Sequence, residues 1–119
     1  AGGTRPELAL RSQTLVRLGR GSDATSALET WLATHPQDAT LWQLLASAWQ
    51  QQGQPLRALR AEAEARAAHY DYAAAVDRFK AGQELARKRN GPNDYIEASI
   101  IDTRLRTVAS RLREQAAER

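Results

Sequence analysis

Few side chains in this sequence have the types and spacing that chemistry requires. Cysteine is absent, which excludes a thiol nucleophile, a disulfide and a cysteine-ligated metal. The two histidines, His35 and His69, belong to no HExxH motif, and zinc needs three or four converging ligands. The segment Gly19-Arg20-Gly21 lacks the Lys-Ser/Thr pair of a phosphate-binding loop, and the serines have no flanking glycine elbow. We therefore expect no enzyme activity in this chain, and no catalytic residue, cofactor or metal site.

The composition indicates a single helical domain. The 119 residues suffice for one domain, and the dominant Ala, Leu, Arg, Gln and Glu lose little rotamer freedom in a helix. No run approaches the ~18 apolar residues of a membrane span, and no signal peptide is visible. Methionine is absent even at position 1, so we interpret the chain as a fragment. Residues 1–4 would be a linker or a cloning remnant, and residues 5–119 one domain.

Helical spacing predicts six helices, over about 5–18, 23–34, 39–52, 55–68, 72–88 and 94–115. No stretch alternates with period two, so we expect no sheet. Glycines and the loop 90–93 separate the helices. The expected N-caps are side chains that accept an orphan backbone N–H, namely Thr4 with Glu7, Ser22, Asp38, Asp71, and Asp94 with Glu97.

Apolar residues mark the faces that these helices should bury. Trp42 and Trp49 share a face with Leu45, so we expect both of them, and Trp31, to pack in the core rather than to stack on a ligand. The last helix carries one continuous apolar face, made of Ile101, Leu105, Val108 and Leu112.

The sequence also repeats itself with a fixed period of about 34 residues, a length within the range of repeat architectures. Leu8, Leu15, Gly19, Ala24 and Trp31 recur as Trp42, Trp49, Gly53, Ala58 and Ala65. Such a period is typical of stacked helical repeats, in which no unit buries its apolar face alone. A scaffold of this kind offers a groove rather than a catalytic pocket, so the period predicts a binding function.

The segment 41–49, followed by Gly53 and Ala58, resembles a tetratricopeptide repeat, and the resemblance covers about residues 5–82. It implies an all-α, right-handed stack of antiparallel helix pairs, closed by a long C-terminal capping helix. The units would be 5–38, 39–71 and an irregular third unit with the final helix over 72–119. The pattern Tyr72, Ala75 and Phe79 looks like the second helix of a pair, which follows the fourth helix by half a period instead of a full one.

In tetratricopeptide repeats the first helix of each pair lines the concave face. This face would be polar and hardly charged, and amides that donate and accept at once suit an extended backbone. Ordinary solvated positions explain the same residues equally well. By the matched positions, the candidate protein-binding residues are Ala9, Gln13, Val16, Gln43, Ser47 and Gln50.

A second, narrower resemblance lies in the order and spacing of a few residues along the chain. The stretch from His35-Pro36-Gln37-Asp38 through Trp42 and Gly53 to Tyr95 and Asp102-Thr103-Arg104-Leu105 is similar to the C-terminal repeat domain of bacterial periplasmic zinc metallopeptidases of outer-membrane protein quality control. The resemblance implies a periplasmic location, and protein partners among outer-membrane assembly components or their precursors. The HExxH motif of that family is absent here, so no catalytic residue is carried over.

Two other interpretations remain open. One is a free-standing repeat adaptor with no protease attached. The other is a nucleic-acid-binding repeat, since the second half of the chain supplies all of the net charge of +3. That interpretation is weaker, because aromatic residues for base stacking are not interleaved with the arginines, namely Arg78, Arg87, Arg89, Arg104, Arg106, Arg111 and Arg113. We expect a protein partner and no nucleic acid, and the sequence leaves the oligomeric state open.

Overall fold

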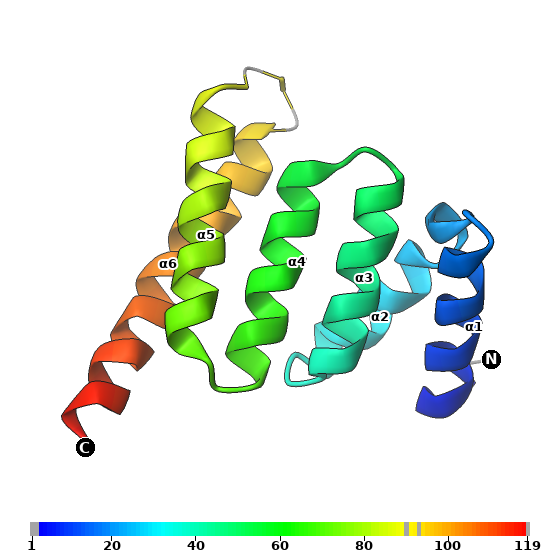
Figure 1. The fold of residues 1–119 in the computed structure, drawn as a ribbon, viewed down its shortest axis with the longest axis horizontal. Helices are drawn as coiled ribbons and strands as arrows, with labels where there is room; N and C mark the ends of the chain where they lie inside the picture. Colours follow the sequence, from blue (N-terminus) through cyan, green and yellow to red (C-terminus); the bar gives the residue numbers. More distant parts are fainter. Residues whose placement is uncertain (1–2, 90, 93, 119) are drawn as a thin grey trace.

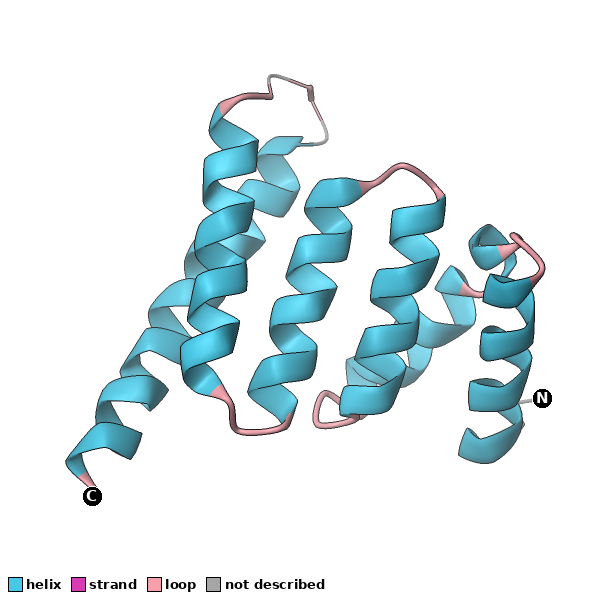
Figure 2. Cartoon of the chain, viewed as in Figure 1, coloured by secondary structure: helices cyan, strands magenta, loops and turns pink. Residues whose placement is uncertain are grey.

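The computed structural model describes residues 3–89, 91–92 and 94–118, and in this part of the chain all regular structure is helical (Figure 2). The predicted linker therefore lies partly outside the described residues, as do positions 90 and 93 of the predicted loop. The elements are α1 Arg5–Arg17, the short 3₁₀ helix η1 Gly21–Asp23, α2 Thr25–Thr34, α3 Ala39–Gln51, α4 Pro55–Ala68, α5 Tyr72–Arg87 and α6 Asp94–Ala117.

The predicted helix starts are confirmed where a capping side chain acts locally. The side chains of Thr4, Asp38 and Asp71 accept hydrogen bonds from backbone N–H groups three residues later. The prediction of Ser22 as an N-cap is wrong, because Ser22 lies inside η1 and α2 begins after Ala24 without a side-chain cap. The 3₁₀ turn accounts for the difference, since it turns the chain into α2 through backbone hydrogen bonds.

The expected capping box of Asp94 and Glu97 is wrong for both members, because Asp94 is already the first residue of α6 and neither carboxylate accepts an N–H of the first turn in the described residues. Glu97 is only 6% exposed, and its carboxylate accepts from Arg60 Nε at 2.9 Å. Asp94 accepts from the backbone N–H of Gly91 at 3.1 Å. The Glu97 carboxylate thus forms an ion pair with Arg60 of α4, whereas the local sequence pattern predicted a hydrogen bond at the start of its own helix.

Three helices end in the same hydrogen-bonded turn with a residue at positive φ. Gly19 and Gly53 follow α1 and α3, with φ of 73° and 67°, and Tyr70 follows α4 with φ of 62°. In each case the next N–H bonds back to a carbonyl five residues earlier, which is the Schellman pattern. Glycine suits this conformation, whereas a side chain there costs roughly 1–2 kcal/mol. Tyr70 is the one non-glycine residue at positive φ in the described residues.

Helices α3, α4 and α5 lie side by side as one layer, with α2 and α6 behind it (Figure 1). Neighbours in sequence pack most closely, from α3 against α4 to α5 against α6, while α1 packs on α3 more than on α2. The result is a thin molecule of 41 × 37 × 22 Å. This packing of adjacent helices is the predicted all-α stack, closed by a long last helix.

Two apolar clusters hold the layer together. One joins α2, α3 and α4, and it includes Trp42 and Trp49, which are 9% and 7% exposed. The other joins α4, α5 and α6 around Phe79, Ile101 and Val108. The core prediction for Trp42 and Trp49 and the apolar face of the last helix are therefore confirmed.

The third unit is more regular than predicted. Helices α1, α3 and α5 begin at Arg5, Ala39 and Tyr72, so the two intervals between their starts are nearly equal. The buried positions Leu41, Leu45 and Ala48 of α3 recur in α5 at the full repeat period, as Ala75, Phe79 and Gly82. Helix α5 is thus the first helix of a third pair, not a second helix that arrives early.

Candidate protein-binding face

Two of the six predicted binding residues line a cavity on the α3–α4–α5 layer. Gln43 and Ser47 of α3 face Ala65 and Arg66 of α4, and His69 just after it, across a cavity of about 350 Å³. Gln43 is exposed and Ser47 is half-buried. These α3 side chains thus form one wall of a shallow depression whose other wall is α4.

A second cavity of about 350 Å³ continues this depression from α4 to α5. Gln43 and Arg66 line both cavities, and the second adds Glu62, Asp77 and Arg78. We call the two cavities together the α3–α5 groove. Its charges balance, with two carboxylates and two guanidinium groups.

The groove is therefore more charged than the sequence indicated. The prediction drew its residues only from the helices at about 5–18 and 39–52, whereas α4 and α5 contribute Glu62, Arg66, Asp77 and Arg78 to the same surface. A signal was present in the sequence, since residues 62 and 66 are four apart and share one helix face.

The remaining predicted residues do not line the α3–α5 groove. Ala9 is partly buried and packs against the first apolar cluster. Gln13 is exposed on α1, and Gln50 is exposed in the last turn of α3. The backbone carbonyl of Val16 accepts a hydrogen bond from Gln51 Nε2.

Gln51, the residue after Gln50, connects the first turn of the fold to α3. Its Oε1 accepts from the backbone N–H of Gly21 at 2.9 Å, while its Nε2 binds the end of α1. A Cβ on Gly21 would lie 2.9 Å from Ala48 Cα, so η1 approaches α3 through a glycine. One amide thus joins α1, η1 and α3.

Both histidines lie at helix ends, as predicted, and they line one open cavity of about 610 Å³. The His35 ring stacks on Trp31 with centroids 3.8 Å apart. Within the described residues no group of three or more His, Asp or Glu side chains could hold a metal ion. Trp31 is half-buried rather than in the core, and its Nε1 donates to Asp38 Oδ2 at 3.0 Å.

The carboxylate of Asp38, which lines the same cavity, accepts several hydrogen bonds. Arg5 Nε and Nη2 donate to its two oxygens at 2.7 and 2.9 Å, and these hydrogen bonds lower the pKa of Asp38 below its usual range. Burial opposes the shift, and the Trp31 and Leu41 N–H donors add to it. The same carboxylate caps α3 and joins α1 to it, so its role is structural.

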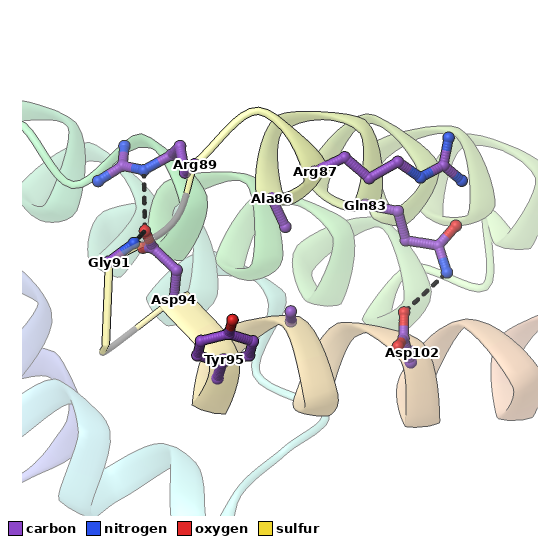
Figure 3. Close-up of a pocket in the computed structure, with 9 residues that line it drawn as sticks. Gln83, Ala86, Arg87, Arg89, Gly91, Asp94, Tyr95 and Asp102 are labelled. Carbon is purple, nitrogen blue, oxygen red and sulfur yellow. Dashed lines mark hydrogen bonds and ion pairs between the residues drawn. The ribbon is translucent and has the colours of Figure 1, made fainter.

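A further cavity of about 410 Å³ lies between α5 and the start of α6 (Figure 3). Gln83 donates to Asp102 at 2.8 Å across it, and Arg89 pairs with Asp94 at 3.3 Å. Tyr95 is 74% exposed beside it. The polar groups drawn here mostly satisfy one another, so this cavity offers fewer groups to a ligand than the α3–α5 groove.

Four of the seven arginines that suggested nucleic acid contact carboxylates in the described residues. Arg87 contacts Glu84, Arg89 contacts Asp94, and Arg104 contacts Glu64 at 2.7–3.3 Å. Phosphate binding depends on basic groups that displace counterions, and local pairing weakens that contribution. No helix among the described residues is both long and apolar enough to cross a membrane.

Comparison with known proteins gives one match. The family model described as tetratricopeptide repeat matches residues 5–48, which comprise α1, α2 and most of α3. No curated protein and no solved structure matches the chain. The family match and the packing of adjacent helices together support a tetratricopeptide-repeat domain, a kind of domain that generally binds other proteins and catalyses no reaction.

Proposed function

We propose that this chain binds an extended segment of a partner protein along the α3–α5 groove. The observation that carries the proposal is the sharing of Gln43 and Arg66 by two adjoining cavities, which makes one surface across three helices. The Gln43 amide can donate to and accept from a partner backbone. Because the groove has balanced charges, it suits a segment with both acidic and basic side chains rather than a lone carboxylate.

Site-specific photocrosslinking tests this assignment. Benzoylphenylalanine at position 43 is expected to form adducts with the partner, because this position lines both cavities of the groove. Position 13 is the matched control, since Gln13 is also an exposed helical glutamine but lies on α1. Position 113 serves as a second control on α6. Adducts at position 13 or 113 without adducts at 43 would place binding elsewhere.

A charge reversal gives a second, independent measurement. Arg66→Glu is expected to lower the yield of the adduct at position 43, because the substitution puts three carboxylates in a groove that otherwise holds two. Arg17→Glu changes the net charge equally on an exposed position of α1 and should leave the adduct unchanged. Equal yields from both variants would contradict a role for the groove charges.

We further propose that the chain is the C-terminal repeat domain of a periplasmic zinc metallopeptidase that recognises outer-membrane assembly components or their precursors. The proposal is supported by the order and spacing of residues from His35 to Leu105 in the sequence. The reading frame upstream in the parent gene is the test. An HExxH motif and a signal peptide there are expected, and a frame that lacks both would leave a free-standing adaptor.

A further inference from the structure

A second cleft opens on the opposite side of α4 from the α3–α5 groove. It encloses about 530 Å³ between the turn before α3, the second half of α4 and the middle of α6. On α4 the groove is lined by Glu62 and Arg66, whereas the cleft is lined by Glu64 and Ala67. At about 100° per residue these two pairs lie on opposite helix faces. We call this cavity the α4 cleft.

The cleft exists because α2 does not cover α4. Helix α4 packs closely on α3 and α5 and more sparingly on α6, and α2 contacts α3 instead. Figure 1 shows α2 and α6 behind the layer, on either side of α4. Pro36 and Gln37 form one wall of the opening, and Arg104, Thr107 and Arg111 form the other.

Tyr70 at the edge of the cleft is held in a strained conformation. It lies at φ 62°, at the turn position that Gly19 and Gly53 take after α1 and α3. Its side chain is largely exposed, at 64% for the residue, and its ring meets Tyr72 edge-on with centroids 6.3 Å apart. Little buried area compensates the strain, so the fold alone does not account for a tyrosine here. Strained residues of this kind gather at binding sites.

The charges of the cleft favour an anion. Arg104 is neutralised by Glu64 through two hydrogen bonds of 2.7 and 2.8 Å. Arg111 contacts one carboxylate in the described residues, that of Glu114 in the next turn of α6, at 3.7 Å with both side chains 61% exposed. This pair is weak, so the Arg111 guanidinium can turn to a ligand.

We propose that the α4 cleft is a second peptide-binding site, which takes a short extended segment of a partner protein with a carboxylate next to an aromatic side chain. The carboxylate binds Arg111, and the aromatic side chain packs against Tyr70 and Tyr72. Trp42 lies at the base, where its Nε1 donates to the Pro36 carbonyl at 2.9 Å. The site is independent of the α3–α5 groove, because it faces the other side of the layer.

The three tryptophan indole N–H resonances allow a direct test by NMR. Titration of the 119-residue chain with N-acetyl-Phe-Glu-amide is expected to shift the Trp42 indole signal with saturation, and to leave Trp31 and Trp49 unchanged. The Phe-Gln analogue and inorganic phosphate at equal ionic strength are the comparison probes. A response to phosphate or to the Gln peptide equal to that of the Glu peptide would overturn the proposal, as would a stationary Trp42 signal.

Two arginine variants identify the carboxylate partner. Arg111→Gln is expected to weaken binding of the Glu peptide about fivefold, which corresponds to the free energy of one exposed charge pair. The variant should then bind the Glu and Gln peptides with equal affinity. Arg113→Gln removes the same charge from an exposed residue of α6 that does not line the cleft, and should change nothing. Equal weakening by both variants would show a general charge effect and refute the site.

Tyr70→Gly separates binding from folding. The glycine relieves the positive φ, so the melting temperature should stay the same or rise, while peptide binding falls at least fivefold. A large fall in melting temperature would mean that the ring stabilises the fold. Unchanged binding would remove Tyr70 from the site. Either result contradicts the role assigned to it.

Discussion

Replacing Arg104 by methionine is expected to lower the free energy of unfolding by about 2 kcal/mol. Arg104 of α6 holds both oxygens of Glu64 of α4 at 2.7 and 2.8 Å, and the Glu64 side chain is 10% exposed. Breaking a fully buried pair by removing one partner costs about 3–5 kcal/mol, because the other charge stays desolvated. The Arg104 side chain is 37% exposed, so water screens the pair and we take the smaller value.

The two partners differ in a way that makes the reasoning testable. Glu64→Met leaves Arg104 without its partner, but this guanidinium can turn to water, so the expected loss is about 1 kcal/mol. The double variant Glu64→Met/Arg104→Met removes both charges and should be within about 1 kcal/mol of the parent. The expected order of stability is therefore parent or double variant, then Glu64→Met, then Arg104→Met.

Urea unfolding monitored by circular dichroism gives the free energy of unfolding of the parent and the three variants on one scale. The loss expected for Arg104→Met corresponds to roughly 8 °C in melting temperature for a domain of this size. Arg113→Met is the control, since it removes an exposed arginine from the same helix. A double variant as unstable as Arg104→Met, or a larger loss from Glu64→Met than from Arg104→Met, would refute the desolvated-charge explanation.

Three further predictions concern single sites elsewhere. The pKa of Asp38 is lowered in the folded chain, so its charge stabilises the fold above its ordinary pKa of 3.8 and this contribution is lost as the pH falls through the folded pKa. The stability gap between the parent and Asp38→Asn, measured by urea unfolding, should therefore be present at about pH 6 and shrink below about pH 4, and a constant gap would contradict this. Gly21→Ala should cost more than Gly19→Ala, about 2 against about 1 kcal/mol, because only the former meets backbone at 2.9 Å; equal losses would show that η1 can move away. Trp49→Phe should cost less than Trp42→Phe, because Trp49 Nε1 is buried with no hydrogen-bond partner in the described residues, whereas Trp42 Nε1 has one; thermal melts showing the reverse order would contradict this.

The sequence predicted the helices well because their ends depend on neighbouring residues. Asp38 and Asp71 cap α3 and α5 through N–H groups three residues away, and glycines end α1 and α3. Glu97 was misassigned because its partner Arg60 lies 37 residues earlier, on another helix. No local pattern specifies such a contact, since it depends on how α6 lies against α4.

The binding surfaces were predicted less completely for the same reason. The α3 residues Gln43 and Ser47 were found from the repeat, because the repeat defines which face of α3 turns outward. The charged residues of the groove come from α4 and α5, and they join it only because three helices lie side by side. The Tyr70 conformation was not foreseen, since the aligned turns both use glycine.

The structure locates the irregularity of the repeat in a connection rather than in a helix. The burial pattern of α3 recurs in α5 at the full period, and Gly82 lets Ile101 of α6 approach to within 3.0 Å of where a Cβ would lie. The link between α3 and α4 spans residues 52–54, whereas the link between α5 and α6 spans 88–93. The longer link means that α6 does not repeat the register of α4, and its contacts with α4 include the ion pairs of Glu97 and Arg104. Helix α4 packs less on α6 than on α3 and α5, and these long side chains bridge the two helices, which leaves part of α4 accessible from behind.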